Sequence, residues 1–302
     1  MSRLRLLASV CIVSALALGA SLAEAAPPAS LPDGPDLSLM ALRAGDLGQA
    51  TVVREGYETE QGSVAAYSRT FSFPRGARLL AAVETVSLLG TSAQAQSELA
   101  AVRRMLANRR QRAAFARSFA NGFMQGSGMR ARNVTSSRPV SLGIGVDSLR
   151  VAIRFRTPVG RIHAVFAIVR VDRAVAIVLL AGQPGRSIPA AEVVRLGRVQ
   201  RDLFRTGFTV AVGTAPVLSG VAAQGQTLSA DRGRWSGGPS EYAYQWSRCD
   251  AAGGACAPIA GAVAPTYAVG PQDVGSTLKV TVTARNSVSS APADSALSAV
   301  VT

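Results

Sequence analysis

The sequence predicts two domains: an α+β N-terminal domain, in which helices cover an antiparallel sheet, and an all-β sandwich at the C-terminus. Its 302 residues, 48% of them hydrophobic, exceed one ordinary domain and supply enough apolar material for two cores. A break in composition at residues 207–216 separates a basic region from a neutral one. Before the break, strand-like alternation and helix-like spacing both occur, whereas short alternating runs separated by turn residues follow it.

The first 25 residues have the features of a secretory signal peptide. Arg3 and Arg5 form its basic start, residues 6–22 an uncharged apolar run, and Ala-Glu-Ala at 23–25 a cleavage site. The alternative is a segment that stays uncleaved as an anchor, although the run is slightly short for a membrane span. No later run is apolar enough for a transmembrane helix. The sequence therefore predicts a secreted or surface-displayed protein whose mature chain has no membrane span.

A Pro-rich, extended lead-in at 26–36 precedes the first domain, which is predicted over 37–206. Residues 37–43 fit either a short helix or a strand. Alternating apolar residues predict strands over 63–73 and 77–89, which a Pro-Arg-Gly turn joins into a hairpin.

The stretch 92–123 is predicted to be helical, as one helix or as two joined near Asn108. It contains no Pro and a single Gly, close to its end. Apolar residues recur at the spacing of three to four that lets a helix bury one face. They are Leu99, Val102, Leu106, Phe115, Phe119 and Phe123.

A meander of three strands follows, over 147–156, 161–171 and 174–180. Thr-Pro-Val-Gly and Asp-Arg separate these strands, and both are typical of tight antiparallel turns. A helix over 189–205 closes the domain, because Pro189 suits a first helical turn and an apolar stripe continues from it.

This order of hairpin, helix, meander and helix resembles exported PsbP-like α/β/α sandwich domains, which include sensor and lipoprotein domains. The early hairpin carries Tyr-x-Arg-x-Phe at 67–71, and the late one carries Arg-Val-Asp-Arg-Ala-Val-Ala-Ile-Val at 170–178. The resemblance spans residues 36–206. It implies a non-catalytic binding or accessory module.

After a linker at 207–216, short motifs occur in register over the second domain, 217–302. They are Gly-Gln-Thr-Leu (225–228), Trp-Ser-Gly (235–237), Tyr-Gln-Trp-Ser-Arg-Cys-Asp (244–250), Asp-Val-Gly-Ser-Thr-Leu (273–278) and Val-Thr-Ala-Arg-Asn-Ser (282–287). This pattern resembles the Ig-like repeat of secreted actinobacterial proteins, which implies a β-sandwich. Trp246 is then the core anchor, and the inner face of another strand carries Leu278, Val280, Val282 and Ala284.

Without the signal peptide, Cys249 and Cys256 are the remaining cysteines. Two cysteines in an oxidising compartment most simply form a disulfide. The segment 250–255 between them has the composition of a hairpin loop, which that disulfide would close. One histidine and three cysteines in all exclude a His-rich metal site and a four-thiolate zinc site, and no metal or cofactor is predicted.

The net charge of +14 is concentrated in one region. Residues 26–212 hold 25 Arg and 12 acidic residues, whereas residues 213–302 have no net charge. Within the basic region, residues 101–138 hold nine Arg and no acidic residue. The candidate polyanion-binding residues are Arg103, Arg104, Arg109, Arg110, Arg112 and Arg117.

Two interpretations of these arginines stay open. A basic helix face would contact an envelope protein or an anionic wall or membrane polymer. Alternatively, a core-packing helix has an Arg-rich solvent face, because 31 Arg against one Lys is a ratio that GC-rich codon usage produces. A nucleic-acid partner is disfavoured for two reasons. An exported protein meets few nucleic acids, and the polar face of this segment has no aromatic residues among its arginines for base stacking.

The sequence favours an exported, non-enzymatic binding protein of the cell envelope, with the sandwich as spacer or docking surface. One alternative is a ligand-sensing domain with an apolar pocket between the sheet and the 92–123 helix. The other is an exported hydrolase that uses His163, the sole histidine, with a Ser hydroxyl or a carboxylate beside it. The acidic cluster of Glu55, Glu58 and Glu60 fits solvated surface better than a glycosidase pair or a calcium site.

Overall fold

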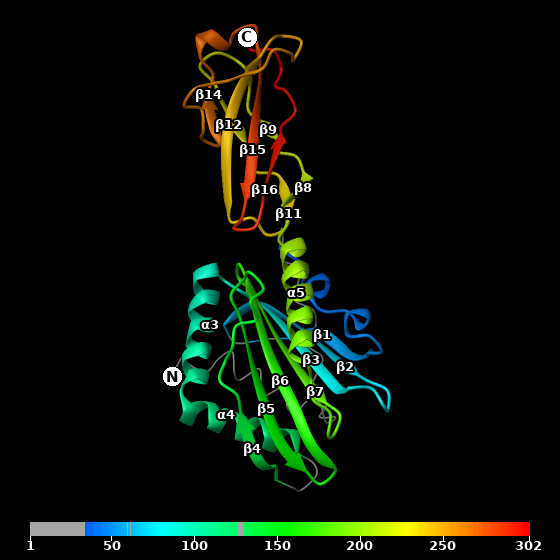
Figure 1. The fold of residues 1–302 in the computed structure, drawn as a ribbon. Coiled ribbons are helices and arrows are strands. Elements are labelled where there is room, and N and C mark those ends of the chain that lie inside the picture. The colour runs from blue at the N-terminus through cyan, green and yellow to red at the C-terminus, as the bar shows by residue number, and fades with distance from the viewer. Residues whose placement is uncertain (1–33, 59, 61, 126–129) are drawn as a thin grey trace. The chain divides into compact units, whose positions relative to one another are not determined.

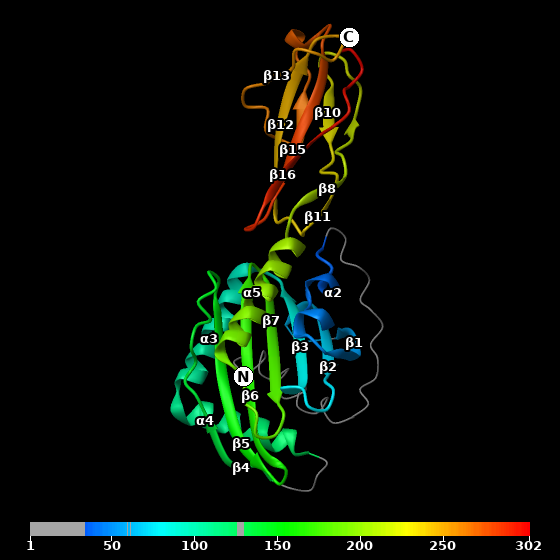
Figure 2. The same ribbon diagram turned by 45° about the vertical axis from the view of Figure 1, so that its right-hand side comes forward.

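The structure, a computed structural model, describes residues 34–58, 60, 62–125 and 130–302 (Figure 1 and Figure 2). The predicted signal peptide, 1–25, and residues 26–33 of the predicted lead-in lie outside the described residues. The chain divides into two compact units. Among the described residues, the first unit lies within Asp36–Arg205, and the second comprises Thr206–Thr302 and residues 34–35.

The first unit is built on a seven-stranded sheet of order β1-β2-β3-β7-β6-β5-β4, in which all neighbours are antiparallel (Figure 1). Its strands are β1 (Thr51–Glu58), β2 (Ser63–Ser72), β3 (Leu79–Leu89), β4 (Arg132–Ser136), β5 (Ser148–Thr157), β6 (Gly160–Val171) and β7 (Ala174–Gly182). The five strands that apolar alternation predicts are β2, β3, β5, β6 and β7, and they are confirmed. Alternation missed the edge strands β1 and β4, because neither contains a fully buried residue.

Helices lie on both faces of this sheet (Figure 2). On one face, α3 (Ser92–Ala107) and α4 (Arg109–Phe123) contribute Leu99 and Phe119 to a core shared with the strands. On the other, α5 (Ala190–Gly207) contributes Val193 and Leu196 to a second core. The short helix α2 (Leu37–Met40) and the 3-10 helix η1 (Ala44–Leu47) precede the sheet. None of the helices among the described residues is long and apolar enough to cross a membrane.

The predicted fold class, an α+β domain whose sheet is covered by helices, is wrong. Strands make up 41% of the described residues and helices 23%, and the seven-stranded antiparallel sheet dominates the first unit. The helices do not fully bury any residue of the edge strand β1. The sequence undercounted the sheet because alternation reveals only strands that bury one face.

Asn108 divides the predicted helix 92–123 into α3 and α4. Its side-chain Oδ1 accepts hydrogen bonds from the backbone N of Arg110 (3.0 Å) and Gln111 (3.1 Å), which makes Asn108 the N-cap of α4. Its own backbone N–H donates to the Arg104 carbonyl and ends α3. One residue therefore terminates one helix and starts the next, so of the two predicted arrangements the pair of helices joined near Asn108 is the one that forms.

The second unit consists of strands and one short 3-10 helix, η2 (Pro271–Asp273). Its strands are β8 (Ala211–Thr214), β9 (Leu218–Ser219), β10 (Thr227–Ala230), β11 (Arg234–Ser236), β12 (Glu241–Cys249), β13 (Ala257–Pro258), β14 (Thr266–Ala268), β15 (Thr277–Arg285) and β16 (Ser290–Asp294). They form sheets of order β14-β10-β9, β13-β12-β15-β16 and β11-β8. Strand β8 lies inside the segment 207–216 that was predicted as the linker.

The sheets of the second unit enclose one core around Trp246 of β12, which is 0% exposed. Leu278, Val280, Val282 and Ala284 of β15 are buried in the same core, as their alternation predicts. Trp246 pairs directly with Val280 across the two strands. The predicted inner face of this strand is confirmed.

The predicted disulfide joins Cys249 and Cys256. Cys249 ends β12 and is buried, while Cys256 directly precedes β13, which pairs with β12. The disulfide therefore closes the hairpin loop between these two strands.

Candidate functional site

Five of the six predicted arginines lie on the exposed surface of α3 and α4. One of them, Arg103, is paired, because its Nη2 lies 2.5 Å from Asp147 Oδ1. The others have no ion pair or side-chain hydrogen bond to any residue that the structure describes. They are Arg104, Arg109, Arg110 and Arg117.

Arg112 does not belong to this surface. Its side chain is 8% exposed, and Nη1 donates to the backbone carbonyls of Leu106 (2.6 Å) and Ala107 (3.0 Å). These carbonyls end α3 and receive no hydrogen bond from within the helix. Arg112 therefore caps α3 and is a structural residue.

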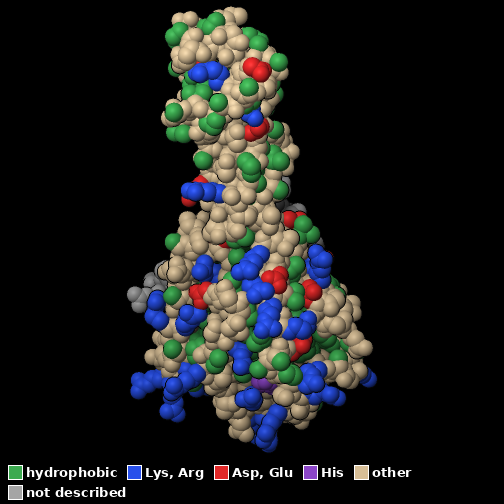
Figure 3. Space-filling model, turned by 45° about the horizontal axis from the view of Figure 1, so that its top comes forward, with side chains coloured by type: hydrophobic (Ala, Val, Ile, Leu, Met, Phe, Trp, Pro, Cys, Tyr) green, Lys and Arg blue, Asp and Glu red, His purple; other side chains and the backbone are tan. Residues whose placement is uncertain are grey.

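A second arginine surface, absent from the predictions, lies on β4, β5 and β6. The register pairs Arg156 with both Arg132 and Arg161, and it pairs Arg154 with His163. Paired residues of antiparallel strands share a face, as do residues two apart in one strand. We call these four exposed arginines and His163 the β4–β6 arginine face. Figure 3 shows many blue side chains over the visible face of the first unit, all of them Arg, because the one Lys of the chain is Lys279 in the second unit.

One signal for this face is visible in the sequence. Arg154 and Arg156 stand two apart in a predicted strand, and Arg161 follows directly across the next turn. Strand periodicity therefore places Arg154 and Arg156 on one face, and the register of the hairpin adds Arg161 to them. The contribution of Arg132 comes from an edge strand that periodicity did not predict.

His163 is 8% exposed, and its Nδ1 accepts a hydrogen bond from the backbone N of Ile188 at 2.8 Å. Its Nε2 is buried and has no partner among the described residues. Burial, with the positive charges of Arg154 and Arg150, lowers the pKa of His163. The hydrolase alternative requires a Ser hydroxyl or a carboxylate beside this ring, and neither is hydrogen-bonded to it in the described part of the chain.

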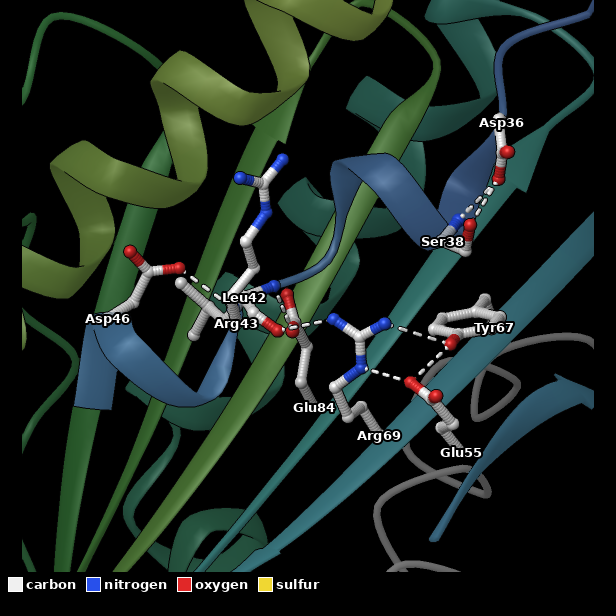
Figure 4. A network of polar contacts seen from close by, with 9 residues as sticks. All are labelled: Asp36, Ser38, Leu42, Arg43, Asp46, Glu55, Tyr67, Arg69 and Glu84. Carbon is white, nitrogen blue, oxygen red and sulfur yellow. Dashed lines mark hydrogen bonds and ion pairs between the residues drawn. The ribbon is translucent and has the colours of Figure 1, made fainter. Parts of the chain in front are cut away.

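A polar network holds the N-terminal segment against the sheet (Figure 4). Glu84 of β3 is fully buried, and its Oε2 accepts a hydrogen bond from Leu42 N at 2.7 Å. Arg69 of β2 donates to Leu42 O at 2.7 Å and to Glu55 Oε2 at 2.6 Å. The Tyr67 hydroxyl donates to the same Glu55 oxygen at 2.7 Å. Both backbone groups of Leu42 are therefore held by side chains of the sheet.

Burial raises the pKa of Glu84 to about 8, so its carboxyl group is largely protonated at neutral pH. Its Oε1 has no hydrogen-bond partner among the described residues. A perturbed carboxyl group is a candidate for acid–base chemistry. Here the segment around Leu42 packs against it, so the geometry favours a role in docking that segment. Over the same described residues, no group of three or more His, Cys, Asp or Glu gathers as a metal site would require.

Hydrogen bonds from Tyr67 and Arg69 lower the pKa of Glu55. Glu55 is thus engaged in the network on β1 and β2, and Glu60 accepts a hydrogen bond from Ser87. The acidic cluster around 55–60 does not converge on one point.

A small hollow lies between β3, β7 and α4, where the ligand-sensing alternative places an apolar pocket. Its volume is about 10 Å³, and Ala82, Phe119, Phe123 and Leu179 are among its lining residues. Such a volume holds about one water molecule, whereas small-molecule pockets measure about 300–1,000 Å³. This hollow has no room for a ligand.

Comparisons with known proteins give no family: no family model and no curated protein matches the chain. The extracellular domain of PknH from Mycobacterium tuberculosis is 11% identical, with a TM-score of 0.38, over 58% of this chain and 100% of that chain. A multi-domain fragment of titin is 11% identical, with a TM-score of 0.22, over 78% and 75% of the two chains. A β-1,2-glucanase from Parabacteroides distasonis is 13% identical, with a TM-score of 0.19, over 84% and 36%. Likenesses this low define neither a family nor a function for this chain.

Proposed function

We propose that this chain is an exported, non-enzymatic binding protein of the cell envelope. Its first unit binds an anionic wall or membrane polymer through the helix arginine surface, and the Ig-like second unit serves as spacer or docking surface. The helix arginine surface comprises Arg103, Arg104, Arg109, Arg110 and Arg117. The observation that carries the proposal is that four of these five exposed arginines have no partner among the described residues.

The position of Arg109 and Arg110 supports a binding role. They begin α4, where the helix dipole presents partial positive charge, and no acidic residue offsets them in the first turn. Each exposed cation at a helix N-terminus costs about 0.3–1 kcal/mol. Helix stability therefore does not account for these two residues, whereas attraction to a polyanion does.

Retention on immobilised heparin and on wall teichoic acid tests this proposal. We expect the double variant Arg109→Ser/Arg110→Ser to elute at lower salt than the wild type. The slope of log affinity against log salt should fall by about two, one for each lost contact.

The matched control is Arg75→Ser/Arg198→Ser, which removes the same charge from exposed positions elsewhere in the first unit. The control should keep most of the retention. Equal losses in both double variants would reduce the effect to net charge and overturn the assigned surface. No retention of the wild type on either polymer would overturn polyanion binding altogether.

A further inference from the structure

The β4–β6 arginine face concentrates positive charge without compensation. Arg156 lies directly between Arg132 and Arg161 in the register, with Arg154 two residues away on the same face. Like charges directly opposite each other in a sheet repel. None of the four has an acidic partner in the described chain, so this repulsion is not relieved within it.

His163 adds a fixed hydrogen-bond donor to this face. Its Nδ1 accepts the Ile188 N–H, so Nδ1 carries no proton and the neutral ring must carry its proton on Nε2. This Nε2–H is buried and finds no acceptor among the described residues. A buried donor without an acceptor is unfavourable, so it is a natural contact for an incoming acceptor.

We propose that the β4–β6 arginine face is a binding site for a phosphate group, with His163 Nε2–H and the guanidinium groups of Arg154 and Arg156 as its donors. Phosphate fits because its several oxygens accept hydrogen bonds from different directions and its charge offsets more than one arginine. Arg132 and Arg161 flank the site and supply further positive charge. Arg154 is exposed and lies directly across from His163 in the register, so its guanidinium group is within the same part of the face as the ring.

This site is separate from the helix arginine surface. It lies on the sheet face whose core includes Val165 and α5, whereas α3 and α4 pack on the opposite face. The inference therefore does not depend on the proposed polymer binding by α3 and α4. The phosphate group could come from free phosphate, from a phosphate-containing wall polymer or from a lipid headgroup, which share this chemistry.

The single histidine makes a direct test possible, because every imidazole nitrogen signal in an NMR spectrum of the full chain belongs to His163. We expect inorganic phosphate to shift the Nε2 resonance in a saturable manner, while chloride at matched ionic strength does not. A saturable shift with a phosphate polymer or with vesicles containing an anionic phospholipid, but not with phosphate alone, also supports the site and identifies its source. No shift with any of the three, or an equal shift with chloride, would overturn the proposal.

Variants then locate the contact. Arg154→Ser/Arg156→Ser should weaken phosphate binding about tenfold or more, since charged hydrogen bonds are lost. Arg109→Ser/Arg110→Ser should leave the phosphate-induced shift of His163 unchanged, even where retention on heparin is lost. Full affinity in Arg154→Ser/Arg156→Ser, or equal weakening in both double variants, would contradict the assigned donors. His163→Asn is a second variant. Because it has no imidazole, phosphate binding is followed through the guanidinium NMR signals of Arg154 and Arg156, and we expect this binding to be weaker than in the wild type.

Discussion

At the residue scale, Glu84 shows how a fully buried carboxyl group is accommodated. Its Oε2 accepts one backbone hydrogen bond, from Leu42, and Arg69, which pairs with Glu84 across β2 and β3, donates hydrogen bonds to Glu55 and to the Leu42 carbonyl. Desolvation therefore dominates and raises the pKa of Glu84 to about 8. The neutral, protonated form is the one that suits this site.

A pH dependence of stability follows from this pKa. Because the pKa of Glu84 is raised from 4.5 in the folded chain, its stabilising contribution is full below pH 4.5 and is lost as the pH rises through about 8. We expect the free energy of unfolding of the first unit to fall by about 1 kcal/mol between about pH 7 and pH 9. Chemical unfolding followed by the helical circular-dichroism signal measures this change.

The matched variant is Glu84→Gln, which keeps an acceptor for Leu42 N and cannot ionise. Its free energy of unfolding should be nearly constant across the same pH range. His163 does not disturb the comparison, because its pKa is lowered from 6.5 and its effect on stability lies at more acidic pH. A wild-type curve parallel to that of the variant would contradict the protonated carboxyl group.

At the element scale, the junction of α3 and α4 depends on two side chains that act on different helix ends. Asn108 caps the start of α4, and Arg112 caps the end of α3. Periodicity predicted the helical stretch but left open whether it is one helix or two joined near Asn108. It did not distinguish Arg112 from its exposed neighbours, because that difference depends on how the two helices cross.

We expect Asn108→Ala to lower the free energy of unfolding of the first unit by about 1 kcal/mol, because two backbone N–H groups of α4 lose their acceptor. Chemical unfolding followed by the helical circular-dichroism signal measures the loss. Asn121→Ala, an exposed position within α4, is the control and should be neutral or slightly stabilising. Equal effects of the two substitutions would show that the cap contributes nothing.

The whole molecule consists of two units that each have cores of their own. In the described residues, a core lies on each face of the sheet of the first unit, and a separate core surrounds Trp246 in the second. The two units also differ in charge, since the excess of arginine lies before residue 213. Both proposed binding surfaces therefore belong to the first unit.

At this scale we expect loss of the disulfide to affect one unit alone. Cys249→Ser/Cys256→Ser should lower the free energy of unfolding of the second unit by about 2–3 kcal/mol, because the closed hairpin loop is released. Both tryptophans of the chain, Trp235 and Trp246, lie in the second unit, so their fluorescence reports its unfolding.

The helical circular-dichroism signal serves as the internal control for that experiment, because α3, α4 and nearly all of α5 belong to the first unit. It should be unchanged in the double cysteine variant. A parallel shift of both signals would mean that the two units unfold as one.

Local sequence patterns were sufficient to predict many of the secondary-structure elements of this protein. Alternation identified five of the seven strands in the first unit, periodicity identified the helical stretch 92–123, and the cysteine count identified the disulfide. The strands and the helix depend on residues that are near one another in the chain. The disulfide was predictable because two cysteines can pair in one way only. The sequence also located the excess of arginine, since charge is a property of composition.

Only the tertiary structure decided which side chains meet. Neither β1 nor β4 contains a fully buried residue, so both escaped alternation and the extent of the sheet was underestimated. The contact of Glu84 with Leu42 and the contact of His163 with Ile188 join residues 42 and 25 positions apart. Such contacts follow from strand register and from the packing of loops on the sheet, which no local pattern encodes. For the same reason, the sequence determined that this chain carries a basic region, and the fold decided that this region has two separate surfaces.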